Sequence, residues 1–421
     1  MDLKLSKYII PSIISMVLIG TYTNIDGFFI GNTAGDDGLA AINIVWPIVA
    51  LITSIGTGIG VGGSVMLGSF RGRDDNKSAE QIKTTMLLML LVVGVISGLL
   101  LWIVSRPLLE LMGASGRVLA YSVDYSDIIC LGSVFQIMGS GLVVLLRNEQ
   151  KTYFSMFCCI AGLIVHLLLD ILLVENYALG GVAVSTVASQ AVVMIMSLFA
   201  LRFDIKAKIK KNNIISILKA STSPLGINFV PSVVLLFTNY FALLSGGTAG
   251  VSAYAVMSYA VYTFDYIYQG VCDGIQPIIS YCWGAGNQTD KKRAVRAAVI
   301  ILAAFTILFI LITPGLIFIM PELFAVSDAA AKMMNTGFVI YAVSYPFKAI
   351  VKFICSYYYS CGKTKLSNVL IYIDPVIFTP MLLAVLSKLF GINGVWLSMT
   401  LAQALVAALG LSLLYKKHSN K

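Results

Sequence analysis

The second half of this 421-residue chain repeats the first half at an offset of 212 residues. Small residues show the repeat most clearly, because they recur in the same order and at the same spacing. In the first half they are Gly35, Gly38, Ala41, Gly58, Gly62 and Gly72, and in the second half Gly247, Gly250, Ala253, Gly270, Gly274 and Gly284. Near the end the offset becomes 213, where Gly181 and Ser185 match Gly394 and Ser398. The repeat predicts two copies of one folding unit.

Both copies consist mainly of long apolar segments. Hydrophobic residues make up 58% of the chain and charged residues 12%, and the mean hydropathy is +0.89. These values lie far from those of an average soluble domain. A membrane-spanning helix needs about 20 apolar residues, and the apolar segments number six in each copy. We therefore predict an all-α integral membrane protein with 12 transmembrane helices in two six-helix lobes around a central cleft.

An even number of spans in each copy determines how the copies are related. Each copy enters and leaves on the same side of the membrane, so the repeats are parallel and related by an axis along the membrane normal, a construction used by secondary transporters. The predicted units are an N-lobe over 1–205, a basic cytoplasmic linker over 206–219 and a C-lobe over 220–421.

Basic residues predict which side of the membrane each loop faces. With the N-terminus inside, the cytoplasmic segments hold 23 of the 29 Lys and Arg residues and the opposite side holds four. This asymmetry follows the positive-inside rule and places both termini in the cytoplasm. The net charge of +9 is then a consequence of topology. We expect the lipid bilayer, and no nucleic acid, as a partner.

The chain lacks the sequence patterns of several other kinds of chemistry. The chain has no G-x-x-x-x-G-K-[ST] motif, so ATP is not expected to be its energy source and we predict no cofactor. The seven cysteines are odd in number and form no C-x-x-C pair. They predict neither a disulfide framework nor a metal site.

Charges inside predicted spans need a reason, because each costs about 2.5–3.5 kcal/mol on insertion scales. Asp26 and Asp170 lie at similar distances along two spans that both run outward, so their carboxylates can meet at one depth. His166 precedes Asp170 by four residues and shares its helical face, and Asn24 adds a polar group near Asp26. We predict a cation or proton site at these four residues. The alternative is that the carboxylates only hydrogen-bond neighbouring helices.

The identity of the ion depends on His166. Two carboxylates at one depth repel each other unless a positive group joins them, and burial favours their protonated form. Several oxygen ligands would instead suit a metal cation, so a sodium ion at Asp26 and Asp170 is the alternative. A charged His166 would oppose sodium. This favours coupling to H⁺ over Na⁺.

The second half carries a different set of polar residues in its spans. They lie on a helical stripe near 250–282 and on one face of the span near 334–360. The stripe holds Tyr262, Asp265, Gln269, Asp273 and Gln276, and the second face holds Lys348 and Lys352. Asp265 and Lys348 lie at similar depth and are candidates to pair. We predict that these residues line a substrate cleft; the alternative is a buried ion pair that only joins two helices.

Three motifs resemble signatures of the multidrug and toxic compound extrusion (MATE) family. Asp26-Gly27 followed by Ile30-Gly31 is similar to the first-span signature of that family. The segment Gly274–Ser280 resembles its span-8 signature, and Leu169-Asp170 with Gly180-Gly181 resembles its span 5–6 region. Together these similarities cover nearly the whole chain.

The resemblance implies two six-helix lobes around a central cleft, and efflux of small organic compounds in exchange for sodium ions or protons. It implies the cytoplasmic (inner) membrane of a prokaryote, and we expect a monomer. Asp26 and Asp170 match the acidic residues of the family's N-lobe cation site. The family usually has Asn where this chain has His166, and this departure disfavours sodium coordination. Lys348 and Lys352 stand where some branches have Asp, so an anionic substrate is an alternative to the usual cationic ones.

Two other functions compete with this interpretation. A lipid-linked oligosaccharide flippase of the same superfamily would want a cationic cleft, which Lys348 and Lys352 partly supply. A membrane enzyme would use the pair His166 and Asp170 as an acyltransferase H-x-x-x-D motif. The motif lies within an apolar span without an accompanying nucleophile, and an enzyme would leave the duplication unexplained. We therefore predict a transporter and no enzyme.

Overall fold

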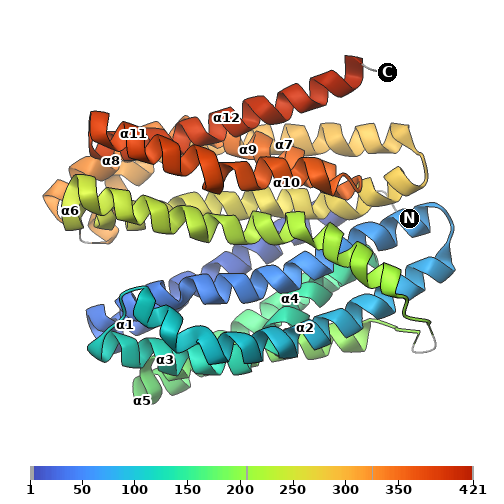
Figure 1. The fold of residues 1–421 in the computed structure, drawn as a ribbon, viewed down its shortest axis with the longest axis horizontal. Coiled ribbons are helices and arrows are strands. Elements are labelled where there is room, and N and C mark those ends of the chain that lie inside the picture. The colour runs from blue at the N-terminus through green and yellow to red at the C-terminus, as the bar shows by residue number, and fades with distance from the viewer. Residues whose placement is uncertain (1–3, 205–206, 325, 420–421) are drawn as a thin grey trace.

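The computed structural model describes residues 4–204, 207–324 and 326–419, with the side chains of 23, 24 and 416–419 excepted. Within these ranges the elements are helices joined by short turns. Figure 1 shows the two halves of the chain as two layers, with the first half below and the second half above. α1 (Ser6–Gly72) begins and α12 (Ile392–Ser419) ends at the same end of the molecule. We call this end the terminal end.

The helices follow the duplicated sequence. The rest of the first half holds α2 (Asn76–Leu111), α3 (Gly116–Leu131), α4 (Ser133–Asn148) and α5 (Thr152–Ala200). The second half opens with α6 (Lys211–Gly284), α7 (Gln288–Leu323), α8 (Asp328–Ala342) and α9 (Tyr345–Ser360). α10 (Thr364–Ile373), the π-helical turn η1 (Asp374–Phe378) and α11 (Thr379–Phe390) then precede α12.

The described helices account for the predicted spans. Seven stretches are long and apolar enough to cross a membrane, and two bent pairs, α3 with α4 and α8 with α9, each make one more. Three of the seven, α1, α5 and α6, consist of two arms joined at a non-helical residue. Counting each arm separately gives twelve spans, six in each half. Large apolar side chains such as Trp102, Phe199 and Phe318 lie exposed, as contact with lipid requires.

Backbone bends repeat with the sequence. Gly35 in α1 has φ 60° and ψ −149°, and Gly247 in α6 has φ 59° and ψ −154°. Such positive φ values favour glycine, which has no Cβ. Asp75 caps the N-terminus of α2 as Asn287 caps that of α7, each accepting from a backbone N–H three residues later. The two halves are thus structural as well as sequence repeats.

The change of offset from 212 to 213 has a structural cause in η1. A π-helical turn accommodates one extra residue within an α-helix, and η1 lies between the last positions matched at 212 and the first matched at 213. Beyond η1 the bends match again. Ala178 has φ 45° and ψ −124°, and Gly391, 213 residues later, has φ 58° and ψ −136°.

Each half buries its own hydrophobic core. The first core is built around residues such as Ile52, Leu145 and Val182, and the second around Tyr268, Phe338 and Trp396. α5 ends at Ala200 and α6 begins at Lys211, so the second part of the predicted linker 206–219 is helical. The lobe boundaries themselves remain predictions.

Six of the recurring glycines lie where the lobes approach each other closely: Gly58, Gly62 and Gly72 of α1 and Gly270, Gly274 and Gly284 of α6. A Cβ on Gly62 of α1 would lie 2.7 Å from the backbone nitrogen of Ser221 in α6. The matching Gly274 of α6 would bring a Cβ within 2.7 Å of the Cα of Ile9 in α1. Ile9 lies near the start of α1 and Gly72 at its end. Because the two arms of α1 run back along each other, both residues lie at the terminal end. Small residues therefore allow the two lobes to pack closely there.

Candidate functional site

The first lobe gathers three buried ionisable side chains. Asp26 lies in the first arm of α1, and His166 and Asp170 lie one helical turn apart in the first arm of α5. Nε2 of His166 lies 2.7 Å from Oδ1 of Asp26 and 3.1 Å from Oδ2 of Asp170. All three side chains are buried. The structure thus brings together three of the four residues predicted for an ion site; the side chain of the fourth, Asn24, lies outside the described residues.

Tyr22 closes one side of this cluster. Its ring meets the His166 ring edge-on, with 4.9 Å between the centroids. Its hydroxyl donates a hydrogen bond of 3.4 Å to the backbone carbonyl of Cys159. The aromatic ring therefore restricts the positions that the imidazole can take between the two carboxylates.

The charge of the cluster depends on how many protons it holds. With a neutral imidazole and two ionised carboxylates it carries two negative charges, and it becomes neutral only after taking up two protons. Charge in an apolar environment is costly unless it is paired. Because Nε2 faces both carboxylates, a protonated imidazole can pair with either of them. The arrangement is suited to holding protons.

Among the residues that the structure describes, the same three side chains form the group that could hold a metal ion. One ligand atom from each of Asp26, His166 and Asp170 lies within 4.8 Å of the others. Hard cations such as Ca²⁺ and Mg²⁺ prefer oxygen ligands, and here an imidazole nitrogen stands between the two carboxylates. This donor set fits a proton better than it fits a hard cation.

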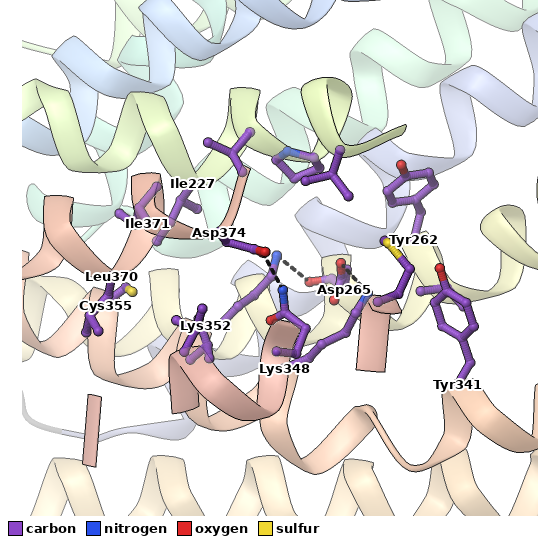
Figure 2. A pocket seen from close by; sticks show the side chains of 18 of the residues that line it. Ile227, Tyr262, Asp265, Tyr341, Lys348, Lys352, Cys355, Leu370, Ile371 and Asp374 are labelled. Atoms are coloured by element: carbon purple, nitrogen blue, oxygen red, sulfur yellow. Dashed lines mark hydrogen bonds and ion pairs between the residues drawn. The ribbon is translucent and has the colours of Figure 1, made fainter. Parts of the chain in front are cut away.

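The second lobe contains a cavity of about 120 Å³. Asp265 comes from the second arm of α6, Lys348 and Lys352 from α9, and Asp374 from η1. Figure 2 shows the two lysine side chains converging on Asp265. Nζ of Lys348 lies 3.4 Å from Oδ2 of Asp265, which confirms the predicted pairing.

The remaining polar contacts of the cavity use neutral groups. Nζ of Lys352 donates to the backbone carbonyl of Asp265 over 3.2 Å. The carboxylate of Asp374 accepts from Oγ1 of Thr379 at 2.6 Å and from Nε2 of Gln403 at 2.7 Å. Sequence reasoning does not predict Asp374 here, because the following Pro375 suggests only a kinked helix. The change of repeat offset near this position is the signal that could have found it.

Aromatic and aliphatic side chains form the walls of the cavity. Tyr262 and Tyr341 are both lining residues, and Figure 2 shows them on the same side of Asp265. The ammonium of Lys348 lies 5.9 Å from the centroid of the Tyr341 ring. Valine, isoleucine and leucine side chains line much of the remainder. The cavity therefore has largely apolar walls, with its charged groups gathered in one place.

The other residues of the α6 stripe lie at the contact between the lobes. Asp273 Oδ2 lies 3.2 Å from a guanidinium nitrogen of Arg147 in α4, and Asp273 Oδ1 accepts from Gln269 at 2.8 Å. Gln276 accepts from Asn148 at 3.1 Å. All these side chains are buried. We call the pairs Arg147–Asp273 and Asn148–Gln276 the latch.

The latch divides the predicted cleft residues into two groups. Tyr262, Asp265, Lys348 and Lys352 line the cavity, whereas Gln269, Asp273 and Gln276 are not among its lining residues. Substrate contact by any of them remains a prediction. The topology prediction counts Arg147 with a cytoplasmic loop, so sequence reasoning missed it as a site residue. Its partner Asp273 lies 126 positions away in the chain.

Comparison with known proteins identifies the family. The profile of the MatE family matches residues 11–172 and 224–383, more than half of the chain. The protein therefore belongs to the MATE family, as its motifs predict. The multidrug export proteins MepA of Staphylococcus saprophyticus and Staphylococcus haemolyticus are each 22% identical to it. These matches cover 96% of this chain and 92% and 91% of those proteins.

Solved structures share the fold. A MOP superfamily transporter from Pyrococcus furiosus, described as having a binding pocket of reverse polarity, superposes with a TM-score of 0.92 at 17% identity. That match covers 99% of this chain and 95% of that one. The Vibrio cholerae MATE transporter VcmN gives a TM-score of 0.91 at 18% identity over 99% and 97% of the two chains. The protein is thus a multi-pass membrane protein with the two-lobed MATE fold, and its family points to a transporter rather than an enzyme.

Proposed function

We propose that this protein exports small organic compounds across the cytoplasmic membrane of a prokaryote in exchange for protons. Its membership of the MATE family and its similarity to MepA multidrug export proteins support export. These relatives do not favour the flippase alternative. The observation that carries proton coupling is the position of His166 Nε2, 2.7 Å from Asp26 and 3.1 Å from Asp170.

Protons are favoured over sodium by the groups that fill the cluster. A sodium ion bound by both carboxylates would lie where the imidazole nitrogen now stands, and a protonated imidazole would repel it. A proton needs no displacement of His166, because it binds to the imidazole or to a carboxylate directly. The cluster of Asp26, His166 and Asp170 then changes charge with each proton while its packing stays the same.

Antiport requires two states of the molecule that ion and substrate stabilise to different extents. A ligand shifts such an equilibrium only through its different affinities for the two states. In the present state the latch and the repeated glycines join the lobes at the terminal end. With the predicted topology this is the cytoplasmic side, so the state described here is closed toward the cytoplasm.

The N-lobe cluster and the latch together suggest a transport cycle. Substrate enters the protein from the cytoplasm, and the lobes close behind it at the latch. Protons arriving from outside bind at Asp26, His166 and Asp170, neutralise the cluster and favour release of substrate and return. One positive charge moving inward across 100 mV contributes about 2.3 kcal/mol, which supports roughly 50-fold accumulation.

The test is transport in proteoliposomes that contain a panel of cationic and anionic fluorescent compounds. A pH gradient and a sodium gradient are imposed separately, with the membrane potential clamped. We expect the pH gradient to drive dye movement and the sodium gradient to have no effect. Asp26→Asn should abolish the movement, whereas Asp36→Asn, the same change at an exposed position of α1, should leave it intact. Movement driven by sodium alone would contradict proton coupling.

A further inference from the structure

The polar groups of the C-lobe cavity are unequally satisfied. Oδ2 of Asp265 is taken by Lys348, and the carboxylate of Asp374 accepts from both Thr379 and Gln403. Lys352 differs from these groups, because its ammonium meets only a backbone carbonyl at 3.2 Å. No carboxylate of the described residues lies within 4.0 Å of its nitrogen.

An ammonium with a single neutral acceptor is incompletely stabilised inside a membrane protein. Lysine carries three N–H donors, and a carbonyl dipole does not neutralise its charge. Charged groups in such places are usually paired with an opposite charge. In the described part of the chain Asp374 also has no cation within 4.0 Å, but both of its oxygens accept short hydrogen bonds, and Asp265 is paired with Lys348. Lys352 has one acceptor for its three N–H donors. The charged group with unused hydrogen-bonding capacity is therefore an ammonium, which a negative group of a ligand would satisfy.

The surroundings of Lys352 specify the rest of the ligand. Tyr262 and Tyr341 line the same cavity together with aliphatic residues of α6 and α9, among them Val261 and Val351. Such walls favour an aromatic or hydrocarbon body. Charge and walls together describe a compound with one negative group attached to an apolar, ring-containing body.

We propose that the C-lobe cavity binds organic anions with an aromatic body, and that Lys352 supplies the positive charge that pairs with their carboxylate or sulfonate. Lys348 stays paired with Asp265, so Lys352 is the cation that the bound anion meets. This proposal rests on the proposed export function, because it names the class of compound carried. It predicts that anions are preferred to cations of the same shape.

A matched pair of probes tests the preference. Naphthoate and naphthylmethylammonium share an aromatic body and carry opposite charges. We would measure the equilibrium binding of both to the full-length protein in lipid nanodiscs by calorimetry. We expect naphthoate to bind at least about tenfold more tightly, the effect of one charge-assisted contact. Tighter binding of the cation, equal binding of both, or binding of neither would overturn the proposal.

Variants then assign the contact to one lysine. Lys352→Gln should weaken the binding of naphthoate about tenfold without weakening the binding of naphthylmethylammonium. Lys352→Arg should retain naphthoate binding, because it keeps the charge. Lys332→Gln, an exposed lysine of α8, is the control for a general loss of positive charge. Thermal melting of each variant in detergent shows whether it is folded. Equal naphthoate affinity in wild type and folded Lys352→Gln would remove Lys352 from the site.

The outcome separates this proposal from the export function. If naphthoate binds through Lys352 but no pH gradient moves any compound in proteoliposomes, the binding site stands and proton-driven export fails. If a pH gradient drives cationic dyes while naphthoate does not bind, export stands and the anion site fails. The two results use different measurements, so neither depends on the other.

Discussion

The N-lobe cluster and the C-lobe cavity occupy the two copies of one duplicated fold, yet they share none of their ionisable residues. The repeat places Thr238 where Asp26 would be and Leu383 where Asp170 would be. In the other direction, Gln136 stands for Lys348 and Ser140 for Lys352. Duplication thus preserved the backbone and its bends, while each lobe acquired its own charges. Under the proposed antiport, this division separates the site of the ion from the site of the substrate.

The latch shows the same difference on a smaller scale. Arg147 and Asp273 form an ion pair between the lobes, and the repeat matches them to Tyr359 and Val61. Tyr359 and Val61 belong to one buried apolar cluster that also contains Val144. At this pair of matched positions, the lobe contact is therefore ionic in one half and apolar in the other. The ionic half can respond to charge, whereas the apolar half supplies burial alone.

The largest expected effect comes from neutralising one carboxylate in each of the two sites in turn. Asp26→Asn should abolish proton-driven transport, because the cluster can no longer gain charge neutrality by taking up two protons. Asp265→Asn should keep proton coupling and change only the affinity for substrate. A pH-sensitive dye trapped in proteoliposomes measures proton movement when substrate is added. If Asp265→Asn stopped the proton movement and Asp26→Asn did not, the roles of the lobes would be reversed.

The second effect concerns the ionic half of the latch. Arg147→Met leaves Asp273 buried without its charged partner, and breaking a buried pair in this way costs about 3–5 kcal/mol. The double variant Arg147→Met with Asp273→Leu should recover most of that loss, since it leaves no unpaired charge. Tyr359→Phe, in the apolar half, loses one hydrogen bond from Ser356, worth about 1 kcal/mol.

Spin labels on the terminal ends of α1 and α6, with thermal melting in parallel, measure these latch variants. We expect Arg147→Met to widen the distance distribution between the labels and Tyr359→Phe to leave it narrow. An unchanged distribution in Arg147→Met would show that the apolar half alone keeps the lobes together.

A smaller effect is expected from the imidazole that separates the two carboxylates. His166→Asn removes the group that a sodium ion would have to displace and supplies an amide oxygen instead. Proton-driven transport should fall roughly tenfold, a loss of about 1.4 kcal/mol of coupling, and a sodium gradient should begin to drive transport. The measurement is dye export under each gradient. Failure of a sodium gradient to drive transport in His166→Asn would contradict the role of His166.

The last effect concerns stability alone and tests the structural equivalence of the two repeats. Ala178 and Gly391 occupy matched bends with positive φ, where a side chain costs about 1–3 kcal/mol. Gly391→Ala should therefore lower the melting temperature, and Ala178→Gly should raise it. Space is no obstacle at Gly391, because no atom lies within 4 Å of a Cβ added there. A higher melting temperature for Gly391→Ala, or a lower one for Ala178→Gly, would indicate that the two bends are held differently.

Much of the fold could be predicted from the sequence. The offset of 212 shows the duplication, and the apolar segments give the number of spans, because both are properties of the chain read locally. The pairing of Asp265 with Lys348 was also predictable, since both lie at similar depth in their spans. The prediction for Asp273 and Gln276 was less specific: they share a helical stripe with Asp265, but a stripe does not tell which neighbouring helix each residue meets.

By itself, then, the sequence determined the two-lobed all-helical membrane fold and the small set of charges that a membrane must accommodate. Only the tertiary structure decided that His166 stands between Asp26 and Asp170, and that Arg147 meets Asp273 across the lobes. Hydropathy and spacing set the depth and face of each residue. Contacts between helices depend in addition on how each helix is rotated and tilted against its neighbours. The close packing of all the side chains together determines these rotations and tilts.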